Sequence, residues 1–533
     1  MRQVDRPSLF LESDSTGGLP KVLPRLAAAV LLALGLGLSA APAAAQDAAA
    51  ARLFQEAARK AEAGDFGAAL DEYRLLVRQF PRDTLAPRAL LGIVDLYRAT
   101  GDERGARGAL DTLLTDYART IEAASGFLVQ GEMAVSAASG PADLQEARAE
   151  FRRVPLLFGT TAYPDLEARA RARVRSAEVG LLLGDPEGAK AELVAAVEDE
   201  PPSPWTGRAR LLLGRTLLDS GDWVAGLEIL QRLADSGALD PDSAESTSPI
   251  VTETDRAQAR HLLSLAHRHR LRPAAGQKRW TDTERFPQGV ALRSPSGVAA
   301  SLENGQVLVV DDRQGLVVLA PSGGGPAQTR QLEDPVRPGF YRDVPYVVTD
   351  DKILLPFDGQ RLSFLEPRTG KPRDLDDLRA AVRGPFGDWF LLAKGWKSLL
   401  HFTGPRTGQE LLGTLRPDPV DLTSDPLGRV VLLDARNDRV IRMGLGRRAQ
   451  QTLVQGDWRR PQALAIDGLG QIYVLDRGEK QVFVYGPEGR PITTVGPQLG
   501  GGIVLSAPVD IAVGSSGRLY IADSKLPFVA VLD

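Results

Sequence analysis

A short apolar phrase that usually ends in aspartate occurs six times in the C-terminal half of the chain. The copies are VLVVDD at Val307, ILLPFD at Ile353, FLLAKG at Phe390, VVLLDA at Val430, IYVLDR at Ile472 and LYIADS at Leu519. Successive copies start 46, 37, 40, 42 and 47 residues apart. A period of this size is typical of small sheets arranged radially around a channel. The phrase therefore predicts an all-β propeller with six blades.

A proline precedes the phrase at a regular distance in four of the six copies. The intervals Pro419–Asp434, Pro461–Asp476 and Pro508–Asp523 span 15 residues, and Pro295–Asp311 spans 16. A proline at the start of a strand removes no needed ladder bond, and a glycine between two strands permits a tight turn. Each interval therefore predicts two antiparallel strands. In blades two and three we expect Phe357 and Lys394 at the position of the aspartate.

Two of these units resemble NHL repeats, namely RPQALAIDGLGQIYVLDRGEKQVFVYGPEG and APVDIAVGSSGRLYIADSKLPFVAVLD. The resemblance is specific over residues 417–533 and implies one blade for each repeat. The last unit stops after its third strand. The segment Arg279–Phe286 stands ahead of the first full blade, so we expect it to supply the fourth strand and close the ring, which would remove an exposed sheet edge.

The repeated aspartates are Asp311, Asp434, Asp476 and Asp523. They suggest either a ring of carboxylates around the channel or acceptors of backbone hydrogen bonds at turns. Repetition of one group at one position favours the structural role, because an active site combines different groups. His401 is the only histidine of this half, which argues against a histidine-rich zinc site. We predict no catalytic, cofactor-binding or metal-ligating residue, and the sequence assigns no residue to a binding surface.

The segment from Ala48 to about Arg270 has the apolar spacing of helices. A Gly-Asp pair recurs in it at Gly64, Gly101, Gly184 and Gly221. Glycine can end one helix in a left-handed conformation, and aspartate can cap the next. The pairs therefore predict helix-turn-helix units. At the end of this segment, His261, His267 and His269 favour contacts with the last helix carbonyls over a metal site.

These helical units resemble tetratricopeptide repeats, most clearly in GDFGAALDEYRLLVRQFP, residues 64–81. The 37-residue spacing of the pairs and the LLVRQFP ending are similar to the envelope subgroup of these repeats, found in outer-membrane assembly lipoproteins and in a coordinator of the Tol-Pal system. The resemblance implies an α-solenoid whose concave face binds a peptide or a partner helix. The alternative is that the repeats only space the signal end of the chain from the propeller.

The N-terminal residues have the features of an export signal. Lys21 and Arg25 supply positive charge, Leu26–Leu38 is apolar, and Ala43–Ala45 forms a small-residue cleavage site. The alternative is a membrane anchor, because Leu26–Ala45 contains no charge and is long enough to span a bilayer. We expect cleavage and no stable membrane span in the mature protein.

The chain is thus predicted to be a multidomain α and β protein, with an N-terminal α-solenoid of tetratricopeptide-like helix pairs and a C-terminal six-bladed all-β propeller. The expected boundaries are 1–45 for the signal peptide, 46–270 for the helical repeats, 271–277 for a linker and 278–533 for the propeller.

The composition of the chain argues against two classes of function. The 64 basic and 68 acidic residues nearly cancel, which gives no reason to expect nucleic-acid binding, and the absence of cysteine excludes a lipoprotein anchor. We expect an exported, periplasmic or envelope-associated, non-catalytic scaffold without a cofactor, which binds an envelope protein, a peptide or a cell-wall component. The alternative is a calcium-dependent propeller hydrolase or lyase with a helical targeting domain, because carboxylate ligands dispersed over several blades would leave no local motif.

Overall fold

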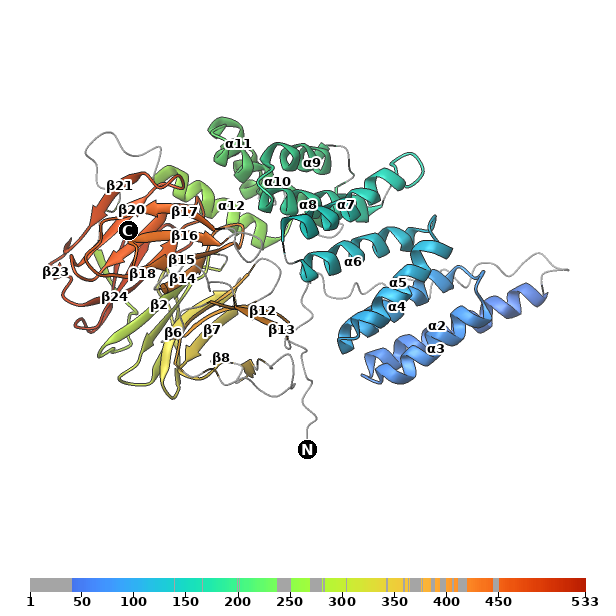
Figure 1. The fold of residues 1–533 in the computed structure, drawn as a ribbon, viewed down its shortest axis with the longest axis horizontal. Coiled ribbons are helices and arrows are strands. Elements are labelled where there is room, and N and C mark those ends of the chain that lie inside the picture. Colours follow the sequence, from blue (N-terminus) through green and yellow to red (C-terminus); the bar gives the residue numbers. More distant parts are fainter. Residues whose placement is uncertain are drawn as a thin grey trace. The chain divides into compact units, whose positions relative to one another are not determined.

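The fold is seen in a computed structural model of the chain (Figure 1). It describes residues 41–138, 140–164, 166–198, 200, 202–236, 251–268, 280, 283–302, 304–341, 344–357, 360–362, 364, 375, 377–384, 389–393, 399–404, 407–410, 419–443 and 450–533. The predicted linker 271–277 and residues 1–40 of the predicted signal peptide lie outside the described residues, as does His269.

The N-terminal half is helical, as predicted. The helices are α2 (Ala41–Glu62), α3 (Phe66–Gln79), α4 (Leu85–Thr100), α5 (Glu103–Asp116), α6 (Ile121–Ala137), α7 (Pro141–Leu157), α8 (Glu167–Leu182), α9 (Pro186–Glu198), α10 (Pro204–Asp219), α11 (Trp223–Asp235) and α12 (Glu253–Ala266). The chain divides into two compact units, and the boundary between them passes through α6, α7 and α8. The second unit contains α9 to α12 and the whole propeller.

The Gly-Asp pairs form the turns between paired helices. All four glycines have a positive φ, between 76° and 90°. Each following aspartate (Asp65, Asp102, Asp185 and Asp222) accepts a hydrogen bond from the backbone N–H three residues later. This geometry confirms the predicted helix-turn-helix units, since glycine adopts the left-handed turn without strain and aspartate satisfies a free amide of the next helix. Their similarity to tetratricopeptide repeats remains a resemblance in sequence.

The C-terminal half is a six-bladed propeller, as predicted. Blade one contains β2 (Pro295–Ala300), β3 (Gln306–Asp311), β4 (Leu316–Pro321) and β5 (Gln328–Gln331); blade two contains β6 (Pro335–Tyr341), β7 (Val344–Thr349), β8 (Ile353–Leu355) and β9 (Gln360–Leu362); blade three contains β10 (Leu378–Arg383), β11 (Trp389–Ala393), β12 (Leu400–Gly404) and β13 (Thr407–Glu410). Blade four contains β14 (Pro419–Ser424), β15 (Val430–Asp434), β16 (Arg439–Met443) and β17 (Gln450–Gln455), and blade five contains β18 (Pro461–Ile466), β19 (Ile472–Asp476), β20 (Gln481–Tyr485) and β21 (Pro491–Val495). A hairpin of β22 (Gln498–Gly500) and β23 (Ile503–Val504) precedes blade six.

Blade six joins the two ends of the propeller sequence. It contains β24 (Pro508–Val513), β25 (Leu519–Asp523), β26 (Val529–Leu532) and, as its outer strand, β1 (Thr283–Phe286). The pairing runs antiparallel from Thr283 against Leu532 to Phe286 against Val529. The predicted ring closure by the segment ahead of blade one is therefore confirmed. The six first strands contact one another in a closed order: β2, β6, β10, β14, β18, β24 and again β2.

The strand assignment in blade two corrects the sequence prediction. The phrase at Ile353 forms the third strand, β8, and the second strand is β7, which ends at Thr349. Pro335 pairs with Thr349 as Pro295 pairs with Asp311, and in blade three Leu378 pairs with Ala393. Thr349 and Ala393 thus stand where Phe357 and Lys394 were expected. The misassignment arises because two consecutive strands of blade two are equally apolar, so that composition alone does not set the register.

Candidate functional site: the propeller channel

The repeated aspartates hold the segment through which the chain enters each blade. Asp311 accepts hydrogen bonds from the backbone N–H groups of Arg293 and Ser294, and Asp476 accepts them from Arg459 and Arg460. Asp523 does the same for the two residues before Pro508. These carboxylates are fully buried. The backbone-holding role is confirmed, and each of these entry segments runs directly into a first strand at the rim of the channel.

All four repeated aspartates also accept hydrogen bonds from the turn after the second strand, Asp311 from the backbone N–H of Gln314, Asp476 from those of Gly478 and Glu479, and Asp523 from that of Lys525. In blade four this aspartate is Asp434. It accepts hydrogen bonds from the backbone N–H of Arg436 and from the side chains of Asn437 and Arg439. Its partners lie in the turn that follows the second strand, as the sequence predicts. None of the four repeated aspartates belongs to the group of side chains that meet in the centre of the channel, which is described below.

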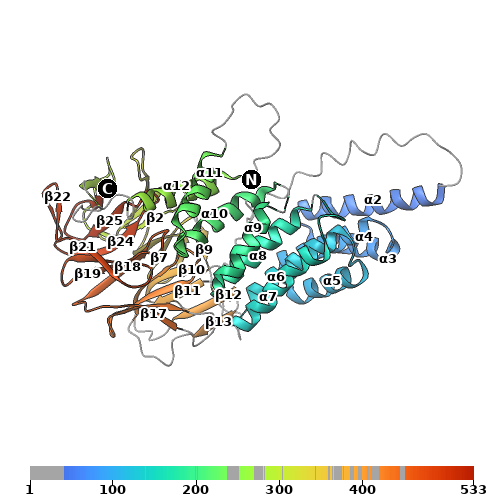
Figure 2. The same cartoon turned by 90° about the horizontal axis from the view of Figure 1, so that it is seen from above.

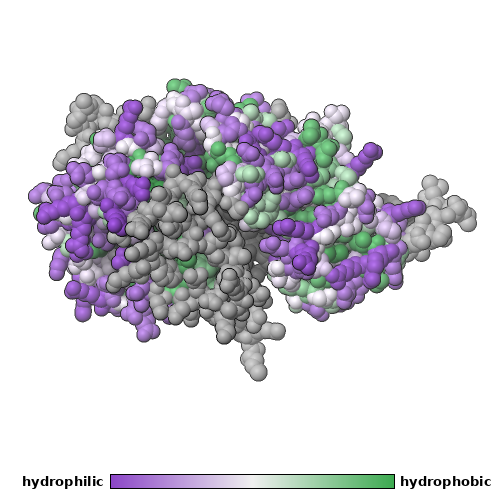
Figure 3. All heavy atoms as spheres, in the orientation of Figure 1, coloured by the Kyte–Doolittle hydropathy of each residue, from purple (hydrophilic) through white to green (hydrophobic). Residues whose placement is uncertain are grey.

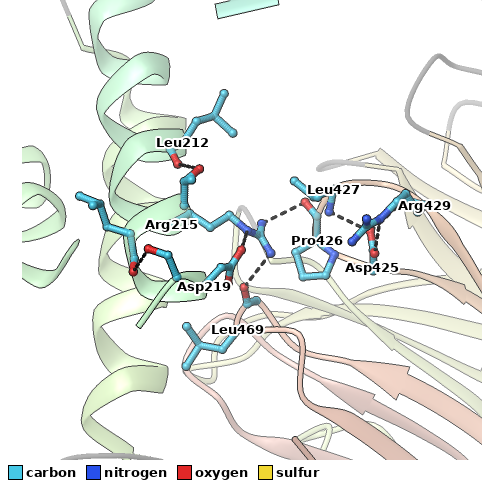
Figure 4. Close-up of polar contacts among 12 residues, drawn as sticks. Leu212, Arg215, Asp219, Asp425, Pro426, Leu427, Arg429 and Leu469 are labelled. Carbon is cyan, nitrogen blue, oxygen red and sulfur yellow. Dashed lines mark hydrogen bonds and ion pairs between the residues drawn. The ribbon is translucent and has the colours of Figure 1, made fainter. Parts of the chain in front are cut away.

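At the opposite end of the first strands, helices α10 and α12 lie against the propeller (Figures 1 and 2). Arg215 of α10 donates to the backbone oxygens of Pro426 at 3.0 Å and Gly468 at 3.2 Å, which belong to the hairpins of blades four and five (Figure 4). His261 of α12 contacts the backbone oxygen of Ser515 in blade six through Nδ1. The turns of three blades therefore hold the two helices, and these contacts lie at the end of the channel away from the entry segments.

Arg215 joins two blades to one helix, so its loss should loosen this contact. We expect Arg215→Met to destabilise the second unit by about 2–4 kcal/mol, because the backbone carbonyls of Pro426 and Gly468 lose a charged donor. Chemical denaturation followed by tryptophan fluorescence would measure the difference. Arg210→Met on the same helix is the control, since Arg210 makes no ion pair among the described residues, and it should change the stability by about 0.5 kcal/mol or less. Equal stability of the two variants would contradict the docking role of Arg215.

His261 makes this contact sensitive to pH. Burial lowers the pKa of His261 to about 4, although its hydrogen bond to Ser515 opposes the shift. The folded state thus keeps the imidazole neutral between about pH 6.5 and 4, whereas the unfolded chain takes up a proton in that range. The contribution of His261 to stability is therefore lost as the pH falls through this window, by roughly 3 kcal/mol in total.

We expect His261→Asn to lose less stability than the parent chain between pH 7 and pH 4.5, by about 2 kcal/mol, because asparagine keeps a donor near the position of Nδ1 and does not titrate. Urea denaturation at the two pH values would measure the difference. His267→Asn, at an exposed position just after α12, should lose as much stability as the parent chain. A parallel loss in all three proteins would refute the assignment to His261.

Three charged side chains meet in the middle of the channel. Nη2 of Arg337 lies 2.6 Å from Oδ2 of Asp421 and 2.8 Å from Oδ1 of Asp510. The two carboxylates are almost fully buried, whereas the arginine side chain is 20% exposed. The three residues come from β6, β14 and β24, which are alternate first strands of the ring. They occupy the same register position, two residues after the first residue of each strand.

Small residues fill the same position in the other three blades. They are Gly297, Ala380 and Ala463, and a β-bulge precedes this position in every blade. A Cβ atom on Gly297 would lie 2.5 Å from Cδ of Pro338, so a side chain there would collide with blade two. Alternation of large and small residues gives one arginine and two aspartates the room to meet at the axis.

The two aspartates also join neighbouring blades. Asp421 accepts hydrogen bonds from the backbone N–H of Leu422 in its own strand and of Leu464 in blade five, both at 2.7 Å. Asp510 accepts them from Ile511 in its own strand and from Val298 in blade one. The inner edge of a first strand has no further strand to pair with, so these carboxylates satisfy amides that would otherwise lack a partner.

The electrostatics of this group leave little room for a bound cation. Burial raises the pKa of Asp421 to about 7, against the attraction of Arg337, and it also raises the pKa of Asp510. Arg337 already lies between the two carboxylates as their counter-ion. Within the described residues, no cluster of three or more His, Cys, Asp or Glu side chains could hold a metal ion. Asp421 and Asp510 thus share the positive charge of Arg337.

Above Arg337 the channel widens into a cavity of about 1150 Å³, called the funnel below. All six blades contribute to its wall. The lining residues are Ser294, Ser296, Asp312, Arg313, Asp334, Pro335, Val336, Arg337, Asp350, Arg379, Val420, Ala435, Arg459, Arg460, Pro461, Gln462, Val509 and Ser524. They lie in the entry segments, at the starts of the first strands and just after the second strands. Through their hydrogen bonds to the entry segments, the repeated aspartates therefore stabilise part of the wall of this cavity.

The funnel could not be located from the repeat itself. Several of the residues that carry its charge, such as Arg459, Arg460 and Arg337, stand beside the recurring proline, at positions where the copies differ from one another. The one sign of the funnel in the sequence is that charged residues replace the residues which other copies of the repeat have at these positions. His401, in contrast, stacks on Phe390 in blade three and is not among the residues that line the funnel.

Known proteins resemble this chain in structure only. No protein-family model matches the sequence, and no curated protein matches it. Similar solved structures include virginiamycin B lyase from Staphylococcus aureus (10% identity, 47% of this chain and 98% of that chain, TM-score 0.37) and the calcium-binding protein regucalcin from Agrobacterium tumefaciens (13%, 48% and 93%, TM-score 0.36). An auxiliary nutrient binding protein from Bacteroides ovatus is also similar (13%, 48% and 72%, TM-score 0.37). Identities of 10 to 13% give no ground for transferring a function to this chain.

Proposed function

We propose that the chain is an exported binding protein of the bacterial cell envelope, in which the funnel of an NHL-like propeller holds part of an envelope protein, a peptide or a cell-wall component. The tetratricopeptide-like helices provide a second binding surface. The observation that supports this function best is the funnel itself. All six blades line it, four of them with charged side chains, while α10 and α12 hold the opposite end of the propeller.

A calcium-dependent hydrolase would need carboxylates and amides from several blades around an ion. At the axis of this propeller, Arg337 stands between Asp421 and Asp510 and supplies the positive charge there. This observation favours binding over metal-assisted hydrolysis.

The visible surface of the propeller is suited to contacts with a water-soluble partner. On the face that Figure 3 shows, the described residues of the propeller are mostly hydrophilic, and the hydrophobic ones are scattered. None of the described helices combines the length and the apolar character needed to cross a membrane. Export itself rests on the sequence of residues 1–45 and is tested by fractionation of cells that express the full chain, with N-terminal sequencing of the recovered protein.

Capture from envelope extract tests the role of the funnel. The bait is the purified chain, compared with an Arg459→Gln/Arg460→Gln variant and with an Arg330→Gln/Arg490→Gln variant. Arg330 and Arg490 are exposed and do not line the funnel, so they form a matched control. We expect a partner that the parent chain and the control retain and that the first variant loses by about tenfold or more. Equal retention by all three proteins would place the binding surface elsewhere.

A further inference from the structure

The charges of the funnel are separated between opposite blades. Asp334 and Asp350 belong to blade two, where they stand at the start of β6 and just after β7. Arg459 and Arg460 belong to the entry segment of blade five. Blade five is three steps from blade two in either direction around the ring, so the two pairs face each other across the funnel. The blade-two side of the cavity thus carries these two aspartates besides Arg337, whose charge is taken up by Asp421 and Asp510, and the opposite side carries two arginines.

Neighbouring charges do not cancel this separation. Blade one adds Asp312 and Arg313 side by side, and blade three adds Arg379. No ion pair among the described residues involves Asp334, Asp350 or Arg460. Arg459 lies 3.9 Å from Glu479, but both side chains are more than half exposed, and such a pair is weak. These groups therefore remain able to bind charges of a ligand.

The wall between the two charged sides suits a peptide. Val336, Val420 and Val509 line it with apolar surface from blades two, four and six, and Gln462 and Ser296 add groups that can hydrogen-bond to amides. A volume of about 1150 Å³ exceeds that of a single amino acid and lies just above the range of about 300–1,000 Å³ that is typical of pockets for drug-sized molecules. A ligand that contacts both sides must carry charges of both signs at its two ends.

From this arrangement we propose that the funnel binds a short zwitterionic peptide, with its carboxylate at Arg459 and Arg460 and its ammonium group at Asp334 and Asp350. The proposal rests on the proposed function, since it names the ligand class of the same funnel. A polyanion would meet the aspartates of blade two, and a polycation would meet the arginines of blade five. The guanidinium group of an arginine can bind a carboxylate through two parallel hydrogen bonds. We therefore assign the carboxylate end of the peptide to the basic side of the funnel.

Affinity selection with three peptide libraries tests the proposal. The probes are random hexapeptides with free termini, the same library with acetylated N-termini, and the same library with amidated C-termini. The purified chain is equilibrated with each library, and the retained peptides are quantified by mass spectrometry after ultrafiltration. We expect free-termini peptides to be retained at least about tenfold more strongly than either blocked library, because each blocked end removes one charge-assisted contact.

Two variants assign the ends of the peptide to the two sides of the funnel. Arg459→Gln/Arg460→Gln should abolish the difference between free and amidated peptides while the penalty of acetylation persists. Asp334→Asn/Asp350→Asn should do the reverse, and Arg330→Gln/Arg490→Gln should behave as the parent chain does. Equal retention of all three libraries by the parent chain would overturn the proposal, and so would a dependence on the carboxylate alone. Partner capture from envelope extract that depends on Arg459 and Arg460, together with no peptide selection, would refute the zwitterionic ligand but leave the binding function intact.

Discussion

A Val531→Asp variant should open the propeller ring and destabilise the second unit by at least about 4 kcal/mol. Val531 lies in β26, is 1% exposed, and pairs with Glu284 of β1 on one side and Tyr520 of β25 on the other. It shares one hydrophobic cluster with Val298 and Val307 of blade one. A carboxylate there would enter the hydrophobic cluster between blades six and one.

The matched control is Thr329→Asp in β5, the outer strand of blade one. Valine and threonine have nearly the same shape, and both residues lie in strands, but Thr329 is exposed. We expect this variant to stay within about 0.5 kcal/mol of the parent chain in urea denaturation. If both variants had the same midpoint, the contact between β1 and β26 would not be what closes the ring.

Ring closure was predictable because it follows from counting strands. Six phrases predict six blades, and a last blade with three strands needs a fourth from elsewhere. The segment that ends at Phe286 precedes blade one and is apolar at its end, so it was the natural donor. The Gly-Asp turns were predictable for a similar reason, since glycine and aspartate each have one strong local preference at a helix boundary.

The centre of the channel was not predictable in the same way. Arg337, Asp421 and Asp510 are 84 and 89 residues apart in the sequence, and nothing local to any of them indicates the other two. Their meeting depends on the register of three alternate first strands, and in blade two the sequence pattern placed the second strand wrongly. The charged residues that line the funnel could not be predicted, because they occupy positions at which the copies of the repeat differ. Periodicity identifies what the blades share, whereas binding uses the residues in which they differ.

Replacement of Arg337 tests the centre of the channel directly. We expect Arg337→Met to destabilise the second unit by about 3–5 kcal/mol, because it leaves two buried carboxylates without their counter-ion. Burial already raises the pKa of Asp421 to about 7, and loss of the arginine should raise it further. Chemical denaturation at neutral pH measures the loss, and Arg379→Met is the control, since Arg379 lines the funnel one blade further on and makes no ion pair among the described residues.

The pH dependence of the Arg337→Met variant shows whether its loss of stability comes from the missing positive charge or from the missing side-chain contacts. A carboxylate whose pKa in the folded state exceeds that in the unfolded chain binds more protons when folded, so it stabilises the fold as the pH falls through that window. The deficit of Arg337→Met against the parent chain should therefore shrink between pH 8 and pH 5. Addition of Asp421→Asn and Asp510→Asn to this variant should recover about half of the loss at pH 8 and remove the pH dependence, because asparagine keeps an acceptor for the amides of Leu464 and Val298. A deficit that is constant with pH would mean that Arg337 fills space at the axis and that its charge does not hold the blades together.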